Sequence, residues 1–244
     1  VTPKAYEENH DGMKTSTAID NVGANMGNGS VMYFGPTIDV AGFGVQVMAG
    51  YAPEASNVAV TDGAVSTSSN LWSSGQELGV KISGMGITAG AYANELTKDS
   101  SDLVTEEDAM TATWHVSYSA GPVSVGYSEF YVDAGVSQSA VVTTGAAKTL
   151  RTSAGFTEGD QIGIAFNVNE NLSLSYTESV ETYDAQDDAA TAIADVDQEI
   201  DAIQVAYSMG GMSIKAYQMD VTNPAFDENA DDSKVTEIAL GLAF

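Results

Sequence analysis

The sequence contains no cysteine, which excludes disulfide bonds, thiolate metal sites and cysteine nucleophiles. Long apolar runs are missing too, since no stretch approaches the roughly 18–20 residues that a membrane-spanning helix needs. Basic residues are scarce, with 8 Lys+Arg against 34 Asp+Glu and a net charge of −26. A nucleic-acid-binding surface needs cations opposite the phosphates, so we expect no nucleic-acid partner.

Against these absences stand a hydrophobic fraction of 43% and eleven tyrosines, which argue against a disordered acidic chain. The acid is unevenly placed. It gathers in four clusters, residues 99–108, 181–188, 195–201 and 227–232. Weakly charged segments lie between these clusters. A halophilic globular protein would instead spread its acid over the whole surface.

The weakly charged segments alternate apolar and small or polar residues. At the end of the chain, Ile238, Leu240 and Leu242 fall on one parity, and Glu237 falls on the other. A period of two is typical of a β-strand with two unlike faces. The pattern predicts about eleven strands, at residues 28–39, 42–52, 76–83, 87–96, 109–119, 123–132, 160–168, 172–182, 199–209, 212–221 and 235–244.

Short turns rich in glycine and asparagine alternate with long connections along the chain. The long connections are residues 53–75, 97–108, 133–159, 183–198 and 222–234. In an antiparallel meander, alternate connections emerge at the same end, so one end is trimmed and the other carries all the loops. Strands of about 9–11 residues suit a tilted crossing of a bilayer. We therefore predict an antiparallel transmembrane β-barrel, which must close because every edge needs a partner in lipid.

Side chains on the apolar parity are expected to face lipid, and the polar parity a wet lumen. Five aromatic residues lie near strand ends on the apolar parity and are candidates for interfacial girdles: Tyr118, Tyr127, Tyr176, Tyr207 and Phe244. The high β-propensity of tyrosine is an alternative explanation for the tyrosines at these positions. A small-residue face at Ile87, Ala89, Ala91 and Ala93 either packs against a neighbouring subunit or merely tolerates alanine.

Two segments resemble Gram-negative general-diffusion porins. Gly42-Phe-Gly-Val-Gln-Val-Met-Ala-Gly-Tyr-Ala-Pro53 is similar to a porin strand that ends at Tyr-Ala-Pro, and Ile238-Ala-Leu-Gly-Leu-Ala-Phe244 is similar to the porin terminal signature. The resemblance identifies residues 1–244 as the carboxy-terminal portion of one barrel domain of about sixteen strands. It implies an outer-membrane location, passive diffusion of small hydrophilic solutes, a homotrimer, contact with lipopolysaccharide, and Phe244 as the assembly signal.

In this family a long loop folds into the barrel and narrows the pore. By strand count, residues 1–27 would be that loop. They contain five candidate constriction residues: Glu7, Glu8, Asp11, Lys14 and Asp20. The chain does not begin with Met and shows no signal peptide, so we interpret it as a processed chain or a fragment.

Five charged or titratable residues fall on the polar parity and are the candidate lumen wall: Glu77, Lys81, His115, Lys215 and Glu237. Inward charges set ion selectivity, although ordinary solvation in a wide pore explains them as well. The excess of acid predicts a preference for cations. We find no catalytic constellation, phosphate loop or metal-ligand spacing, and so predict no enzyme, no cofactor and no resident metal.

Two acidic clusters, 184–188 and 227–232, could bind Ca²⁺ or Mg²⁺, but solvated loops are the simpler interpretation. Three alternatives to a porin stay open at this point. An acidic surface-layer or adhesin-type protein would pack its strands as a sandwich, and a soluble ligand-binding β-barrel would fold without detergent. An outer-membrane enzyme would need a catalytic set that the sequence does not supply.

Overall fold

The computed structural model describes residues 30–53, 72–98, 108–133, 156–184 and 195–243. These residues form one twelve-stranded antiparallel sheet. Its strands are β1 (Val31–Phe34), β2 (Ile38–Val40), β3 (Phe43–Ala52), β4 (Trp72–Gly84), β5 (Ile87–Lys98), β6 (Ala109–Ala120), β7 (Val123–Asp133), β8 (Phe156–Asn167), β9 (Leu172–Asp184), β10 (Val196–Met209), β11 (Met212–Thr222) and β12 (Ser233–Leu242), with a 3₁₀ turn η2 (Pro224–Phe226) before β12.

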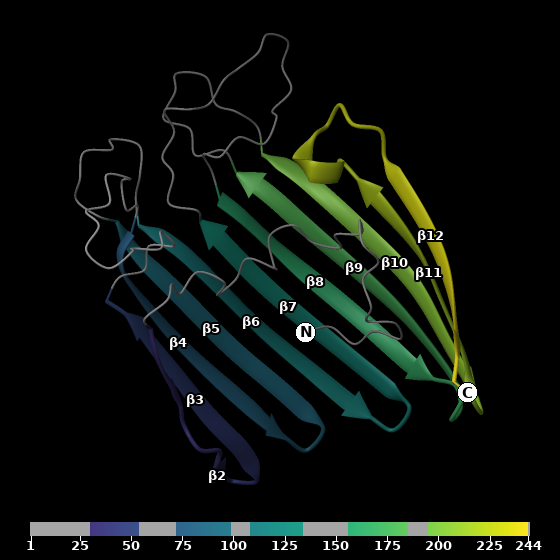
Figure 1. Ribbon diagram of the computed structural model, residues 1–244, viewed down its shortest axis with the longest axis horizontal. Coiled ribbons are helices and arrows are strands. Elements are labelled where there is room, and N and C mark those ends of the chain that lie inside the picture. The colour runs from purple at the N-terminus through teal and green to yellow at the C-terminus, as the bar shows by residue number, and fades with distance from the viewer. Residues whose placement is uncertain (1–29, 54–71, 99–107, 134–155, 185–194, 244) are drawn as a thin grey trace.

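The strands follow one another as a meander in the order β1-β3-β4-β5-β6-β7-β8-β9-β10-β11-β12, and β2 also pairs with β3. Figure 1 shows a curved sheet of slanted strands, with the tight turns together along one edge. We call that edge the turn end and the opposite edge the loop end. Within the described residues β1 and β12 do not pair, so the sheet is open between them. None of the helical residues described here forms a segment that would span a membrane.

The turns of the trimmed edge are tight because their residues accept a left-handed backbone. Ala41 and Gly42 have φ of 55° and 86°, and Met85 and Gly86 have φ of 52° and 80°. Two successive positive φ values are those of a type I′ turn, which matches the twist of a hairpin. The turn positions were predicted to within a residue from these glycines.

The first predicted strand, residues 28–39, is wrong as a single element. The structure divides it into β1 and β2 around Gly35 and Pro36, and both parts pair with β3. Proline has no amide hydrogen to donate, which is tolerated on an edge strand but breaks the ladder locally. The Gly35 amide restores one rung by donating to the Val47 carbonyl at 2.9 Å.

At the loop end, most strands are longer than the alternation predicted. β4 begins at Trp72, β8 at Phe156 and β10 at Val196, and β9 runs to Asp184. Polar cross-strand pairs continue the ladder beyond the apolar stripe, because Thr182 Oγ1 donates to Asp197 at 2.8 Å. Similarly, Gln76 Nε2 donates to Glu95 at 2.6 Å. Cross-strand hydrogen bonds on one face and buried side chains such as Tyr183 and Val196 on the other therefore both accompany the longer strands.

Candidate functional site: a two-faced wall

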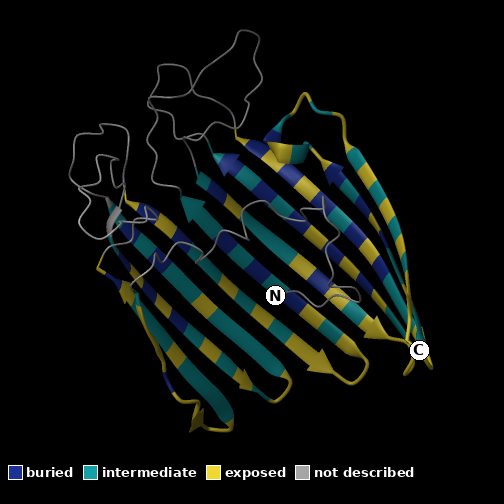
Figure 2. Ribbon diagram, in the orientation of Figure 1, coloured by how far each residue is buried: buried dark blue, intermediate teal, exposed yellow. Residues whose placement is uncertain are grey.

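The register assigns every strand residue to one of two faces. We call the face that carries Leu78 and Ile203 the outer face, and the face that carries Glu77 and Glu237 the inner face. Leu78 lies opposite Ala93, which is on the outer face of β5, and Glu77 lies opposite Asn94 on the inner face. Figure 2 shows the resulting alternation of burial classes along the strands. All later placements follow from this pairing.

Burial on the two faces is the reverse of that in a water-soluble sheet. All the buried strand side chains of the described residues lie on the inner face, and nearly all the exposed large apolar side chains lie on the outer face. Leu78 and Ile203 are each 63% exposed. The exceptions among the exposed apolar residues are Met32 and Phe34 of β1 and Met85 in a turn. An apolar belt left open to this extent requires an apolar surrounding.

Toward the loop end, the outer face changes from apolar to acidic. Glu129 of β7 lies opposite Asp160 of β8, and Glu178 of β9 lies opposite Asp201 of β10. The Tyr127 hydroxyl donates to Glu129 at 2.7 Å. The Tyr127 ring thus stays in the apolar belt while its hydroxyl reaches the carboxylate, which is the behaviour of aromatic residues at a membrane–water border.

The other predicted girdle residues share this outer face. The Tyr176 hydroxyl donates to Asp201 and, at 3.2 Å, to Glu178, so Tyr176 lies at the acidic border like Tyr127. Tyr118 and Tyr207 lie on the outer face nearer the turn end. Phe244 lies outside the described residues.

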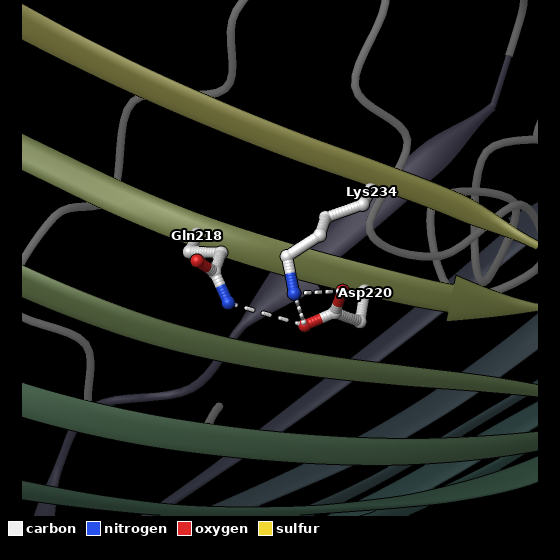
Figure 3. Close-up of polar contacts among 3 residues, drawn as sticks. All are labelled: Gln218, Asp220 and Lys234. Atoms are coloured by element: carbon white, nitrogen blue, oxygen red, sulfur yellow. Dashed lines mark hydrogen bonds and ion pairs between the residues drawn. The ribbon is translucent and has the colours of Figure 1, made fainter.

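At the edge of the sheet, the border between the apolar belt and the polar rim contains an ion pair. Lys234 Nζ of β12 lies 2.8 Å from Asp220 Oδ1 of β11, and Gln218 Nε2 donates to Asp220 Oδ2 at 3.3 Å (Figure 3). All three side chains are on the outer face, on the loop-end side of Ile238 and Leu240. The change from apolar to charged thus continues to the last strand.

The border departs from the hydrogen-bonded rows between β5 and β9, but from β9 to β11 it follows one row, in which Glu178, Asp201 and Asp220 are register partners. Following register partners from Glu95 on β5 across β6, β7 and β8 leads to Asp184 on β9. On β9 the first carboxylate above the apolar stripe is Glu178, six residues nearer the turn end than Asp184. The net shift from β5 to β9 is thus six residues over four strands, and it is uneven, because Glu129 of β7 and Asp160 of β8 share a row.

All five predicted lumen-wall residues lie on the inner face, and four of them form two separate pairs. Lys81 and His115 flank Gly90 in one row of β4, β5 and β6, and a methyl group on Gly90 would meet the imidazole of His115 at 2.6 Å. Lys215 and Glu237 lie on the neighbouring strands β11 and β12. The structure therefore brings Lys81 to His115 and Lys215 to Glu237, but it separates these pairs by the strands between them.

Glu77 is the most buried of the five, at 8% exposure. Its Oε2 accepts a hydrogen bond from the Tyr92 hydroxyl, and its side chain lies over Gly50 of β3, where a methyl group would meet Glu77 Oε1 at 2.5 Å. Within the described residues, Oε1 of Glu77 and Nδ2 of the adjacent Asn94 have no hydrogen-bond partner. This arrangement holds a carboxylate against the wall with one oxygen still able to accept.

Sequence reasoning missed the inward-folded turn η2. Phe226 is 0% exposed and packs on Tyr183, with ring centroids 5.9 Å apart. The Ala225 amide donates to Gln198 Oε1 at 2.7 Å, and Gln198 Nε2 donates to the buried Glu181 at 3.2 Å. Since Tyr183, Gln198 and Glu181 all belong to the inner face, η2 thickens the wall on that side. The signal that could have predicted this turn is Phe226, a single aromatic residue within an acidic connection.

The inner face is also less polar than predicted at the loop end of β10 and β11. An apolar cluster of Ile200, Ala202, Tyr217, Met219 and Val221 is buried there, with Val235 against it. The face that was predicted to be wet therefore contains a buried apolar cluster at this end. Toward the turn end the inner face keeps polar residues such as Ser83, Asn167 and Ser208, which are exposed.

The predicted constriction residues Glu7, Glu8, Asp11, Lys14 and Asp20 lie outside the described residues. So does most of the acidic cluster 184–188. In cluster 227–232, Asp227 Oδ1 accepts from the amide of Asn229 at 2.8 Å. No three acidic or histidine side chains in the described ranges converge as a metal site would require.

No protein-family model and no curated protein sequence matches this chain. Solved structures do match. The outer membrane channel DcaP of Acinetobacter baumannii aligns with a TM-score of 0.53 and 13% identity over 86% of this chain and 60% of the channel's chain. OmpT, an outer membrane protein of Vibrio cholerae, aligns at 0.47 and 16% over 86% and 61%, and the NanC porin at 0.41 and 8% over 88% and 92%.

This chain therefore spans about three fifths of the length of the DcaP chain. At this level of identity the likeness concerns the fold alone. The described strands form an antiparallel sheet of the porin β-barrel type, as the sequence predicted.

Proposed function

We propose that this protein is an outer-membrane porin of a Gram-negative bacterium, which lets small hydrophilic solutes diffuse passively through a water-filled channel. The observation that carries the proposal is the inverted burial of the sheet, with exposed apolar side chains on the outer face and buried ones on the inner face. Exposed apolar area costs about 25 cal/mol per Å² in water, so a soluble barrel or surface-layer protein is disfavoured.

The carboxylates that border the apolar belt on β7 to β11 support the same proposal. An apolar band with aromatic residues at its border is typical of the outer surface of a transmembrane barrel. The likeness to the DcaP channel supports it at the level of the fold. Homotrimer assembly and contact with lipopolysaccharide belong to the proposal through the porin-like segments 42–53 and 238–244.

The inner face supports a preference for cations. Glu77, Glu181 and Glu237 lie on it, and the chain as a whole carries a net charge of −26. Negative charge around a pore raises the local concentration of cations and lowers that of anions. Lys81 and Lys215 oppose this effect locally. In this proposal η2 narrows the channel at its loop end, and residues 1–27 form the constriction.

The test is conductance of the purified, refolded chain in planar bilayers under a potassium chloride gradient. We expect stepwise current increments and a reversal potential with the sign of cation selectivity. Liposome swelling with neutral sugars of increasing size would give the size limit. Refolded protein that inserts into bilayers without conducting would contradict the channel, and an anion-selective reversal potential would contradict the cation preference alone.

A further inference from the structure

The outer face holds a groove between β4 and β7. It has a volume of about 640 Å³ and a floor of small residues, Ala91, Ala93 and Ala112. Leu78 forms one wall and Trp114 the other. Sites that hold small ligands have volumes of about 300–1,000 Å³, so the groove is large enough for one elongated apolar molecule.

The walls of the groove are fixed by contacts at the acidic border. Trp114 Nε1 donates to Glu129 Oε2 at 2.8 Å, and the indole packs on Tyr127 with ring centroids 5.4 Å apart. Tyr131 on the same side packs on Phe156, with centroids 5.2 Å apart. These contacts hold the rings beside the alanine floor, so the groove is a feature of the folded sheet and needs no rearrangement to accept a ligand.

On the side of β8 and β9, the groove continues into an acidic hollow. This hollow of about 270 Å³ is lined by Glu129, Glu158 and Asp160, and it shares Glu129 and Glu158 with the groove. An apolar groove that ends at three carboxylates is complementary to an amphiphile with an apolar tail and a cationic head. The acidic rim disfavours a second copy of this chain as the occupant, because that copy carries the same net charge of −26.

We propose that this groove binds a membrane lipid whose head group carries an ammonium ion, with an acyl chain over Ala91, Ala93 and Ala112 and the ammonium at Glu158 and Asp160. An ammonium has three hydrogens to donate and so can satisfy more than one carboxylate. The proposal rests on the proposed contact of the outer face with lipid. It does not rest on conduction, since its test reads binding in protein that is refolded in neutral detergent.

Trp114 provides the readout. The chain has two tryptophans, so Trp72→Phe leaves Trp114 as the sole indole, which can be excited selectively over the tyrosines. The probes are bromododecyl chains with a primary ammonium, hydroxyl or carboxylate head, whose bromine quenches an indole that it contacts. We expect saturable quenching, with half-quenching by the cationic probe at a concentration about three- to tenfold below that of the hydroxyl probe, as one or two partly exposed ion pairs would give.

Two variants separate the tail from the head. Ala112→Leu should abolish quenching by all three probes because it fills the floor, whereas Ala216→Leu, the same change on the outer face of β11, should leave quenching intact. Glu158→Gln with Asp160→Asn should remove the preference for the cationic probe, whereas Glu178→Gln with Asp201→Asn, which lie outside the hollow, should preserve it.

Four results would overturn the proposal. Equal quenching by the three probes would show a groove without head selectivity. Quenching by the carboxylate probe that requires Ca²⁺ would show a metal-bridged anion instead. Quenching that persists in Ala112→Leu would show non-specific partition into the micelle. Trp114 that no probe quenches, in a protein that crosslinks as an oligomer through Ala93→Cys, would show that a second copy covers the groove.

Discussion

A charge placed on the outer face should destabilise the protein far more than the same charge one residue away. Ile164 lies on β8 between Phe166 and Ile162, within the apolar belt, and is 46% exposed. Its neighbour Ala165 points to the inner face, where its register partners are Ser124 and Ser175. Ile164→Arg and Ala165→Arg therefore introduce one guanidinium into the two environments that the structure distinguishes.

The expected magnitudes differ clearly. Arginine on the lipid face near the bilayer midplane costs about 2–4 kcal/mol of folding free energy. On a wet surface away from packing, a substitution usually changes stability by less than about 0.5 kcal/mol. We therefore expect Ile164→Arg to lower the free energy of unfolding by at least about 2 kcal/mol relative to Ala165→Arg.

The assay is reversible urea unfolding in phospholipid vesicles, followed by tryptophan fluorescence. The slope of the free energy against urea should be the same for both variants if the folded and unfolded states are unchanged. A larger loss for Ala165→Arg would refute the assignment of the faces. Equal and small losses would refute the contact between the outer face and hydrocarbon, and with it the proposed function.

Three further predictions concern the inner face. Phe226→Ala removes a fully buried ring, so the free energy of unfolding should fall by about 3–5 kcal/mol. The single-channel conductance should rise, because η2 would no longer be held against the wall. Unchanged conductance in a destabilised variant would exclude η2 as an element that narrows the channel. Gly159→Ala should cost about 1–3 kcal/mol in the same unfolding assay, because its methyl group would lie 2.6 Å from the Val180 carbonyl oxygen; a neutral result would show that β8 and β9 can separate locally. Glu77→Gln keeps an acceptor for the Tyr92 hydroxyl but removes the charge. The reversal potential should therefore move toward weaker cation selectivity, while the conductance is retained. An unchanged reversal potential would place Glu77 away from the ion path.

The sequence determined the strand meander, the trimmed edge and the two faces. Alternation such as Ile238, Leu240 and Leu242 is local information, because a period of two assigns a side chain to a face once the strand forms. The glycines at positions 42 and 86 likewise located the turns, since few other residues accept their backbone angles. The five lumen-wall candidates could be named for the same reason.

Only the tertiary structure decided how rows on different strands align. The acidic border, the groove over Ala91, Ala93 and Ala112, and the contact of Phe226 with Tyr183 each join residues that are distant in the chain, and their positions depend on register and tilt. Alternation is the same for any register that differs by two residues, so it cannot fix these neighbours. The sequence therefore specified which face each side chain occupies, and the folded sheet specified which side chains meet there.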